Sequence, residues 1–249
     1  MRGWWLLITL ALVSAPAWSS GYDPRAAFAP LDLPGAVNAY RSGSGKPGPS
    51  YWQNRADYRI HATLDPATHG LAGEEAIAYT NNSPDTLDVL WLQLDQNIYR
   101  PGSRSHAADG ATPRRGEGFT DGYTIESVEV EQDGHRIAAR TVESDTRLQV
   151  ALPTPLGGHG GKLTLHVRYR FTIPGAFGGR MAWGKVQGGT IYDLAQWYPR
   201  MAVYDDVRGW DTLPYLASEV LPPGRLIRAA SHAKASEAEK ATSRVFSMR

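Results

Sequence analysis

The sequence predicts an all-β protein that folds as an antiparallel β-sandwich. Apolar and polar residues alternate over many short stretches between Tyr51 and Ile173, as they do along half-buried strands. The 26 glycines and 17 prolines among 249 residues supply frequent turns. No segment before Ser218 keeps a helical apolar period, so long helices are not expected. Seven or more short strands separated by turns are typical of a sandwich.

The strands are expected in seven segments. In chain order these are YRIHATLD (58–65), EEAIAYTN (74–81), LDVLWLQLD (87–95), YTIESVEVEQ (123–132), HRIAARTV (135–142), TRLQVALP (146–153) and KLTLHVRYRFTI (162–173). Asp133 and Gly134 separate two of them and predict a type I′ hairpin, because both central residues of that turn need a positive φ. Another turn is expected at His69 and Gly70.

Two of these segments have informative faces. LDVLWLQLD carries apolar residues on both faces, which predicts a central strand that is buried on both sides. KLTLHVRYRFTI separates its apolar residues from its basic ones, as a strand with one face in the core does. The apolar face holds Leu163, Leu165, Val167, Tyr169 and Phe171, and the other face holds His166, Arg168 and Arg170.

Two long segments are expected to lack regular structure. One runs from about Asn97 to Gly122 and is rich in Gly, Arg and Ser. The other runs from Pro174 to Gly189 and holds six glycines. Loops of this length are usually functional or disordered.

The chain divides into four parts. Residues 1–19 have the Arg2, the short apolar run and the small residues of a signal peptide, with an uncleaved anchor as the alternative. Residues 20–50 are expected to be a Gly/Pro/Ser-rich linker or arm. Residues 51–219 form the sandwich, and residues 220–249 are expected to be an unrelated, disordered or weakly helical tail. The protein is therefore expected in the periplasm or outside the cell, without a membrane span after signal cleavage.

The composition and the histidines argue against several classes of function. A formal net charge of +1 gives no reason to expect nucleic-acid binding. The absence of cysteine excludes disulfides, thiolate metal sites and a cysteine nucleophile. None of the seven histidines belongs to a His-Glu-x-x-His motif, and His61 and His166 are expected to be solvent-facing strand residues. We expect neither a metal site nor a cofactor in this chain.

Two short motifs resemble catalytic signatures but lack their context. GRMAWGK has the spacing of a phosphate loop, but Val186 follows it where Ser or Thr would reach magnesium. Asp205 and Asp206 are adjacent, so on an extended strand they point to opposite faces and do not form an acid/base pair. One of them is expected instead to cap a turn or to pair with Arg200 or Arg208.

Five large aromatic residues occur late in the sandwich region. They are Trp183, Trp197, Tyr198, Tyr204 and Trp210. Such residues could form a sugar-stacking platform, or they could close the core, since each buries about 150–250 Å². Core closure or a domain interface is the expected role, because the sequence shows no partner for a platform.

Three blocks of sequence, taken together and in order, resemble one enzyme family. They are LAGEEAIAYTNNS (71–83), LDVLWLQLDQN (87–97) and AQWYPRMAVYDDVRGWDTLPY (195–215). The same order of blocks opens the N-terminal domain of the M1 (gluzincin) zinc aminopeptidases, especially of their exported bacterial members. The resemblance extends from Tyr51 to about Ser218.

The resemblance implies a sandwich that packs against a thermolysin-like zinc domain and faces a peptide substrate. Gln196 is the nearest counterpart of the residue that anchors the substrate's α-amino group. The other motif residues are implied to be structural or to face the catalytic domain: Trp197, Tyr198, Pro199, Arg200, Tyr204, Asp205, Asp206 and Trp210. The family's Gly-x-Met-Glu-Asn and His-Glu-x-x-His signatures do not occur in this chain. No catalytic residue or zinc ligand is therefore expected here, and the zinc would belong to the catalytic domain.

The departure from the family pattern near Ser218 has two interpretations. A truncated or frameshifted gene would leave the sandwich incomplete at its C-terminal end, whereas a stand-alone module would carry its own tail. The first functional hypothesis is an inactive, substrate-side domain of an M1-type aminopeptidase. The second is a secreted β-sandwich module that binds peptide or carbohydrate, and the third is a scaffold without a ligand.

Overall fold

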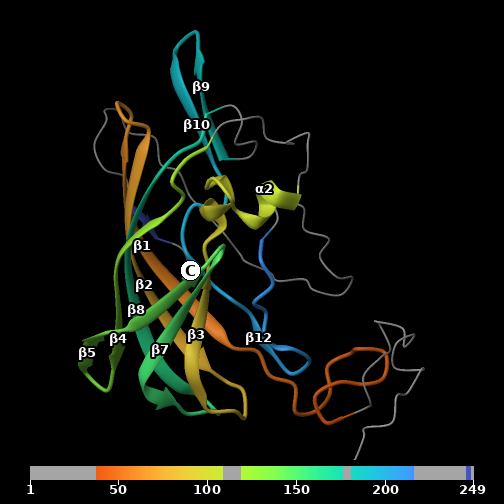
Figure 1. Ribbon diagram of the computed structural model, residues 1–249. Coiled ribbons are helices and arrows are strands. Elements are labelled where there is room, and N and C mark those ends of the chain that lie inside the picture. The colour runs from red at the N-terminus through yellow and green to blue at the C-terminus, as the bar shows by residue number, and fades with distance from the viewer. Residues whose placement is uncertain (1–37, 109–118, 176–180, 216–244, 248–249) are drawn as a thin grey trace, which may run out of the picture.

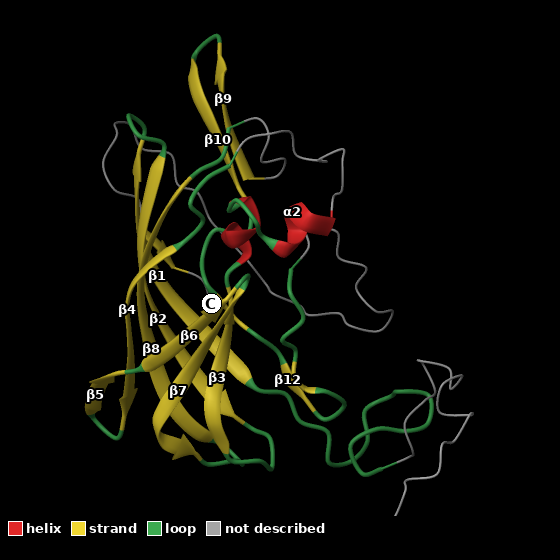
Figure 2. Ribbon diagram, in the orientation of Figure 1, coloured by secondary structure: helices red, strands yellow, loops and turns green. Residues whose placement is uncertain are grey.

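The computed structural model describes residues 38–108, 119–175, 181–215 and 245–247 (Figure 1). These residues form two antiparallel sheets around a shared apolar core, with two short helices and two separate hairpins at the margins (Figure 2). The antiparallel β-sandwich expected from the sequence is therefore confirmed. The segment predicted to be a signal peptide lies outside the described residues, as does most of the predicted tail.

The larger sheet has six strands in the order β14-β1-β2-β8-β4-β5. Their bounds are Val245–Ser247 (β14), Arg55–Asp65 (β1), Gly70–Asn81 (β2), Gly161–Thr172 (β8), Thr124–Gln132 (β4) and His135–Ala138 (β5). β2 and β8 pair along their whole length, from Gly70 opposite Thr172 to Asn81 opposite Gly161. This long pair forms the centre of the sheet, and the other strands extend the sheet on either side of it.

The smaller sheet has four strands in the order β11-β3-β7-β6. Their bounds are Arg200–Met201 (β11), Leu87–Gln93 (β3), Arg147–Leu156 (β7) and Arg140–Ser144 (β6). The helices η1 (Asp95–Tyr99) and α2 (Arg104–Ala108) follow β3. The hairpins are β9 (Met181–Val186) with β10 (Gly189–Leu194), and β12 (Tyr204–Asp205) with β13 (Gly209–Trp210). The β9–β10 hairpin projects beyond the sandwich at the top of Figure 1.

The core is built by alternate residues of the facing strands. On β8 the predicted apolar face is buried throughout, while Arg168 and Arg170 on the other face are exposed. β3 lies between β11 and β7, its leucines are buried, and Val89 and Trp91 on its opposite face are half-buried. The prediction for β8 is confirmed, because side chains alternate across a regular strand. β3 is a central strand as expected, but its second face is half-buried rather than buried.

Asp133 and Gly134 form the turn between β4 and β5, with φ values of 52° and 78°. Both values lie in the left-handed region, as a type I′ turn requires, so the hairpin prediction is confirmed. His69, at the turn between β1 and β2, has a φ of 54°.

Three segments differ from the sequence prediction. The segment Asn97–Gly122 is not wholly irregular, because η1 enters it and α2 lies inside it. Part of the glycine-rich segment Pro174–Gly189 forms β9, whose pattern is obscured because glycine adds no side chain to either face. The segment 135–142 is two strands, since the chain leaves the larger sheet after Ala138 and joins the smaller one at Arg140.

The described part of the predicted tail is the short strand β14. It pairs antiparallel with Arg59–His61 of β1, at the edge of the larger sheet. The sequence did not predict this strand. The rest of the tail at 220–249, for which disorder or a weak helix was expected, lies outside the described residues.

Gly73 on β2 is required by its neighbour on β8. A Cβ atom at this position would lie 2.5 Å from the hydroxyl oxygen of Tyr169, and nearer still to its ring. Tyr169 is itself buried, so its ring has little room to retreat. We expect Gly73→Ala to lower the free energy of unfolding by about 1–3 kcal/mol, measured by urea denaturation. Gly184→Ala on β9 is the matched control, because its added Cβ meets no atom within 4 Å; equal losses in both variants would contradict the prediction.

Candidate functional site

The first part of the third sequence block, Ala195–Met201, lies at a seam between the two sheets. Arg200 and Met201 pair with Gln93 and Leu92 of β3, in the smaller sheet. The N–H of Met201 also donates to the hydroxyl of Tyr58 on β1, in the larger sheet, at 2.9 Å. The segment Ala195–Met201 is thereby fixed to both layers of the sandwich.

Gln196 has a left-handed backbone, with a φ of 52°. Its main-chain oxygen accepts hydrogen bonds from Nε2 of Gln96 at 2.9 Å and from the hydroxyl of Tyr123 at 3.4 Å. Its side-chain oxygen accepts one from the hydroxyl of Tyr215 at 3.0 Å. A non-glycine residue in this region costs of the order of 1 kcal/mol, which these three contacts offset. They also fix where the side-chain amide points.

Arg200 is paired with a buried carboxylate of η1. Its Nε and Nη2 lie 2.8 and 2.7 Å from Oδ2 of Asp95. The Asp95 side chain is 2% exposed and that of Arg200 is 36% exposed. The carboxylate is thus buried, and its arginine partner reaches the surface. Because a buried charge needs a partner, Arg200 holds η1 against the seam.

The two adjacent aspartates have separate structural roles. Oδ1 of Asp205 accepts the N–H groups of Val207 and Arg208 and so caps the β12–β13 turn, which confirms the expected role. Asp206 instead binds Arg41 through three contacts of 2.7–2.8 Å, and this guanidinium lowers the pKa of the Asp206 carboxyl. The side chains do not converge, so they offer no acid/base pair.

The aromatic residues of the motif pack on the core. Tyr198 meets the rings of Tyr58 and Trp197 edge to face, with centroids 5.4 and 5.3 Å apart. Tyr204 and Trp210 lie against each other with centroids 5.1 Å apart. All four motif aromatics contact the core cluster, and Pro199 is buried beside them. Core closure, the expected role, accounts for these contacts.

Trp183 on β9 is engaged within the protein. Its ring stacks on His69 with centroids 3.5 Å apart, and the hydroxyl of Tyr192 lies 2.8 Å from Nδ1 of the same histidine. This contact occupies one face of the indole and attaches the β9–β10 hairpin to the turn between β1 and β2. The arrangement does not favour a sugar-stacking platform at Trp183.

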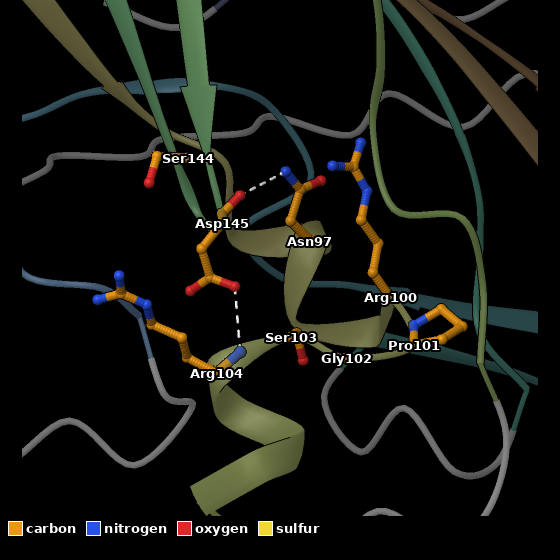
Figure 3. A pocket seen from close by; sticks show the side chains of 8 residues that line it. All are labelled: Asn97, Arg100, Pro101, Gly102, Ser103, Arg104, Ser144 and Asp145. Atoms are coloured by element: carbon orange, nitrogen blue, oxygen red, sulfur yellow. Dashed lines mark hydrogen bonds between the residues drawn. The ribbon is translucent and has the colours of Figure 1, made fainter.

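A pocket of about 370 Å³ lies beside η1 and α2 (Figure 3). It is lined by Asn97, Arg100, Pro101, Gly102, Ser103, Arg104, Ser144 and Asp145. Oδ1 of Asp145 accepts the N–H of Arg104 at 3.1 Å, which ties the start of α2 to the turn between β6 and β7. The lining carries both guanidinium groups and a carboxylate, so it favours neither anions nor cations.

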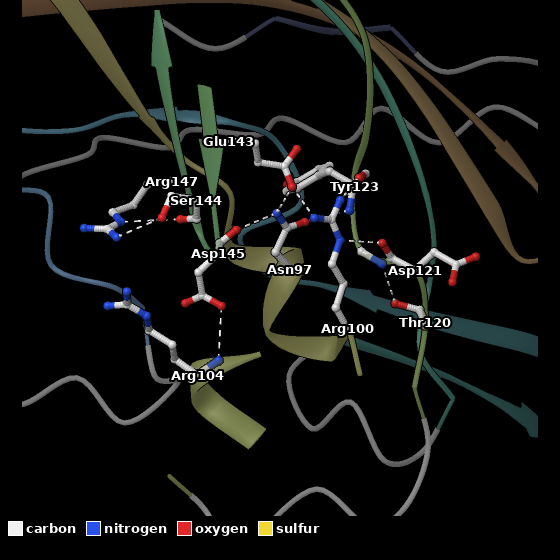
Figure 4. Close-up of polar contacts among 11 residues, drawn as sticks. Asn97, Arg100, Arg104, Thr120, Asp121, Tyr123, Glu143, Ser144, Asp145 and Arg147 are labelled. Carbon is white, nitrogen blue, oxygen red and sulfur yellow. Dashed lines mark hydrogen bonds and ion pairs between the residues drawn. The ribbon is translucent and has the colours of Figure 1, made fainter. Parts of the chain in front are cut away.

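One wall of this pocket is a network of polar contacts (Figure 4). Asn97 donates to Glu143 and to the main-chain oxygen of Asp145, and it accepts the N–H of Tyr123. Arg100 binds Glu143 and the main-chain oxygens of Asp121 and Tyr123. The network joins η1 to β6 and to the segment before β4.

Sequence reasoning missed Asn97 and Arg100 as organising residues. Asn97 is the last residue of the block LDVLWLQLDQN (87–97), and its place in that block was the only signal that could have identified it. The partners of both residues lie 21 to 48 positions away, so no local pattern could have identified them.

The described residues do not fit a zinc site. Nowhere among them do three His, Cys, Asp or Glu side chains come close enough together to hold a metal ion. Of the strand histidines, His61 is exposed as expected, whereas His166 is half-buried and lies 2.8 Å from Glu131. No helix in the described part of the chain is long and apolar enough to cross a membrane.

No protein-family model and no curated protein matches the sequence. Solved structures with some similarity include the M1 zinc metallopeptidase from Deinococcus radiodurans and a mutant of it bound to a Tyr-Ser-Ala substrate. Both matches have 18% identity and a TM-score of 0.32. They cover 49% and 52% of this chain, but only 21% and 23% of the metallopeptidase chains. At this TM-score the likeness carries no argument about this chain.

Proposed function

We propose that this chain is the non-catalytic, substrate-side N-terminal domain of an exported M1-type zinc metallopeptidase. Support comes from the three sequence blocks at 71–83, 87–97 and 195–215, which follow one another in the order typical of that domain. The observation that carries the proposal is the fixed geometry of Gln196. Side chains from η1, from the segment before β4 and from Tyr215 converge on this one residue. Strained backbone that is held in place by several contacts clusters at functional sites.

The proposed task of Gln196 is to receive the α-amino group of a peptide. Its side-chain oxygen already accepts the Tyr215 hydroxyl, and an amide oxygen has a second lone pair for an ammonium donor. Tyr215 would hold the amide in the receiving orientation. The zinc chemistry, in which the metal activates water, would belong to the catalytic domain, because no described residue cluster fits a metal here.

The proposal is tested by an assay of the purified chain, by the downstream genomic sequence and by co-expression. The purified chain should release no product from aminoacyl-anilide substrates, with or without added zinc, because its sequence lacks the His-Glu-x-x-His motif that would bind the metal. Reading the genomic DNA beyond codon 218 in all frames should reveal a His-Glu-x-x-His segment, and co-expression of that segment with this chain should give chelator-sensitive hydrolysis. Chelator-sensitive activity of the chain alone, or a downstream region without that motif, would overturn the proposal.

The reconstituted pair then tests Gln196. We expect Gln196→Ala to raise KM for substrates with a free α-amino group by about tenfold or more, since a hydrogen bond to a charged group contributes about 1.5–3 kcal/mol. Gln53→Ala is the matched control, because Gln53 is exposed and lies outside the seam. Equal KM values for wild type and Gln196→Ala would show that Gln196 does not bind the α-amino group. They would not contradict the assignment of the chain as an N-terminal domain.

A further inference from the structure

Glu75 on β2 is a buried carboxyl group. It is 1% exposed, and neither of its carboxyl oxygens has a hydrogen-bond partner among the residues that the structure describes. It projects from the core face of β2, on the same face as Gly73 and Ile77. Its cross-strand neighbours are Ile60 on β1 and Val167 on β8, both buried and apolar. The group is therefore removed from water on every side.

Among the described residues, the Glu75 charge raises the pKa of four tyrosines from four parts of the fold. They are Tyr58 on β1, Tyr123 before β4, Tyr169 on β8 and Tyr198 in the seam. Burial raises the pKa of each phenol, and the Glu75 charge adds to the rise. The nearby ion pair of Arg200 and Asp95 also acts on Tyr123 and Tyr198, and Arg200 acts on Tyr58 as well, but these two charges are bound to each other. Within the described part of the chain, no cation is thus paired with Glu75.

Such surroundings accept the neutral acid far better than the carboxylate. An ionised carboxyl in an apolar interior normally takes up a proton rather than remain charged. Burial accordingly raises the pKa of Glu75 well above its ordinary value. The hydroxyl of Tyr169 also has no hydrogen-bond partner among the described residues, so it does not stabilise the Glu75 carboxylate.

We propose that Glu75 is a proton-binding site that couples the closure of the sandwich beneath the Ala195–Met201 seam to pH. The folded protein holds this proton at a pH at which the unfolded chain releases it. Release requires water to reach the core face of β2, among these four tyrosines. Alkaline pH therefore weakens the packing of the Ala195–Met201 seam on the core, and mildly acidic pH strengthens it. This inference concerns the sandwich itself and holds whether or not the proposed function does.

The sign of the effect follows from the direction of the shift. Since the folded protein binds the Glu75 proton more tightly than the unfolded chain, its stabilising contribution is complete below the unfolded pKa of about 4.3 and decreases as pH rises. The unfolding constant increases up to tenfold per pH unit, equal to about 1.4 kcal/mol, until the folded pKa is reached. Asp206, whose pKa is lowered, acts in the opposite sense and only at acid pH.

The test compares urea unfolding of the full chain between about pH 5 and pH 9 for wild type and Glu75→Gln. Wild type should lose stability steadily with pH, and the slope should disappear in the variant, which cannot ionise. Glu74→Gln is the matched control, because Glu74 is the preceding residue, exposed and paired with Arg168 at 3.1 Å; it should retain the wild-type slope. Parallel profiles for wild type and Glu75→Gln would overturn the proposal.

A second measurement does not depend on whether Glu75→Gln folds. Infrared spectra of the wild-type chain at neutral pH should contain the C=O stretching band of one protonated carboxylic acid. The band should disappear on alkaline titration, together with the onset of seam loosening in amide exchange of Met201, whose N–H donates to Tyr58. A folded protein with no protonated carboxyl group at neutral pH would contradict the inference.

Discussion

Replacing Arg200 by Met is expected to lower the free energy of unfolding by about 3–5 kcal/mol. The substitution keeps most of the side-chain volume and removes the guanidinium that contacts Asp95. The carboxylate is 2% exposed, so it cannot exchange this partner for water. The loss is the cost of leaving a buried charge without its counter-ion, which is much larger than the net contribution of the pair.

Urea denaturation of three variants checks this prediction. The double variant Asp95→Asn with Arg200→Met should recover a large part of the loss, because it removes the charge that Arg200→Met leaves behind. Arg55→Met is the control, since Arg55 and Asp57 form an exposed pair with 71% and 44% side-chain exposure. Such pairs contribute about 0–1 kcal/mol. If Arg200→Met behaved like Arg55→Met, the buried pair would have no special role in holding η1 to the seam.

Asn97→Ala is expected to lower the free energy of unfolding by at least about 2 kcal/mol. Asn97 is 1% exposed, and its side chain bonds to Tyr123, Glu143 and Asp145. Its removal leaves the buried N–H of Tyr123 without an acceptor, and an unsatisfied buried group of this kind costs about 1–3 kcal/mol. The lost packing of the side chain adds to this cost.

Hydrogen exchange locates the effect of Asn97→Ala. The amide of Tyr123 should exchange faster in the variant, whereas amides in the centre of the β2–β8 pair should follow only the global loss of stability. Asn82→Ala serves as the control, because Asn82 is exposed and its side chain donates only to the main-chain oxygen of Gln53. A variant with unchanged Tyr123 exchange would mean that water replaces the amide oxygen and that the network is not structural.

The strands were predictable where one face meets the core and the other meets water. β8 is the clearest case, because its apolar and basic faces are separated over twelve residues. The division of residues 135–142 between two sheets was not predictable, since β5 and β6 are exposed along nearly their whole length. Without a buried face, the sequence contains no signal that says which sheet a strand joins. The single residue Ala139 makes the change, and its N–H bonds back to Val128.

The candidate site was predictable only where it coincides with a sequence motif. Gln196 was identified by its block, and the cap by Asp205 followed from ordinary turn chemistry. Glu75 was not identified, because it looks like one more polar residue beside Glu74. Its neighbours two positions away, Gly73 and Ile77, place it on the core face, and this is the signal that could have found it. Contacts between residues that are far apart in the chain produce no local pattern in the sequence.

The ion pair of Arg41 and Asp206 has a kinetic consequence, because it joins positions 165 residues apart. Closing so long a loop is entropically unfavourable until both sheets have formed, so we infer that this contact forms after the rate-limiting step of folding. An interaction absent from the transition state slows unfolding and leaves the folding rate almost unchanged. The contact of Arg41 with Asp206 is therefore expected to set the unfolding rate, and so the lifetime of the folded sandwich, rather than the folding rate.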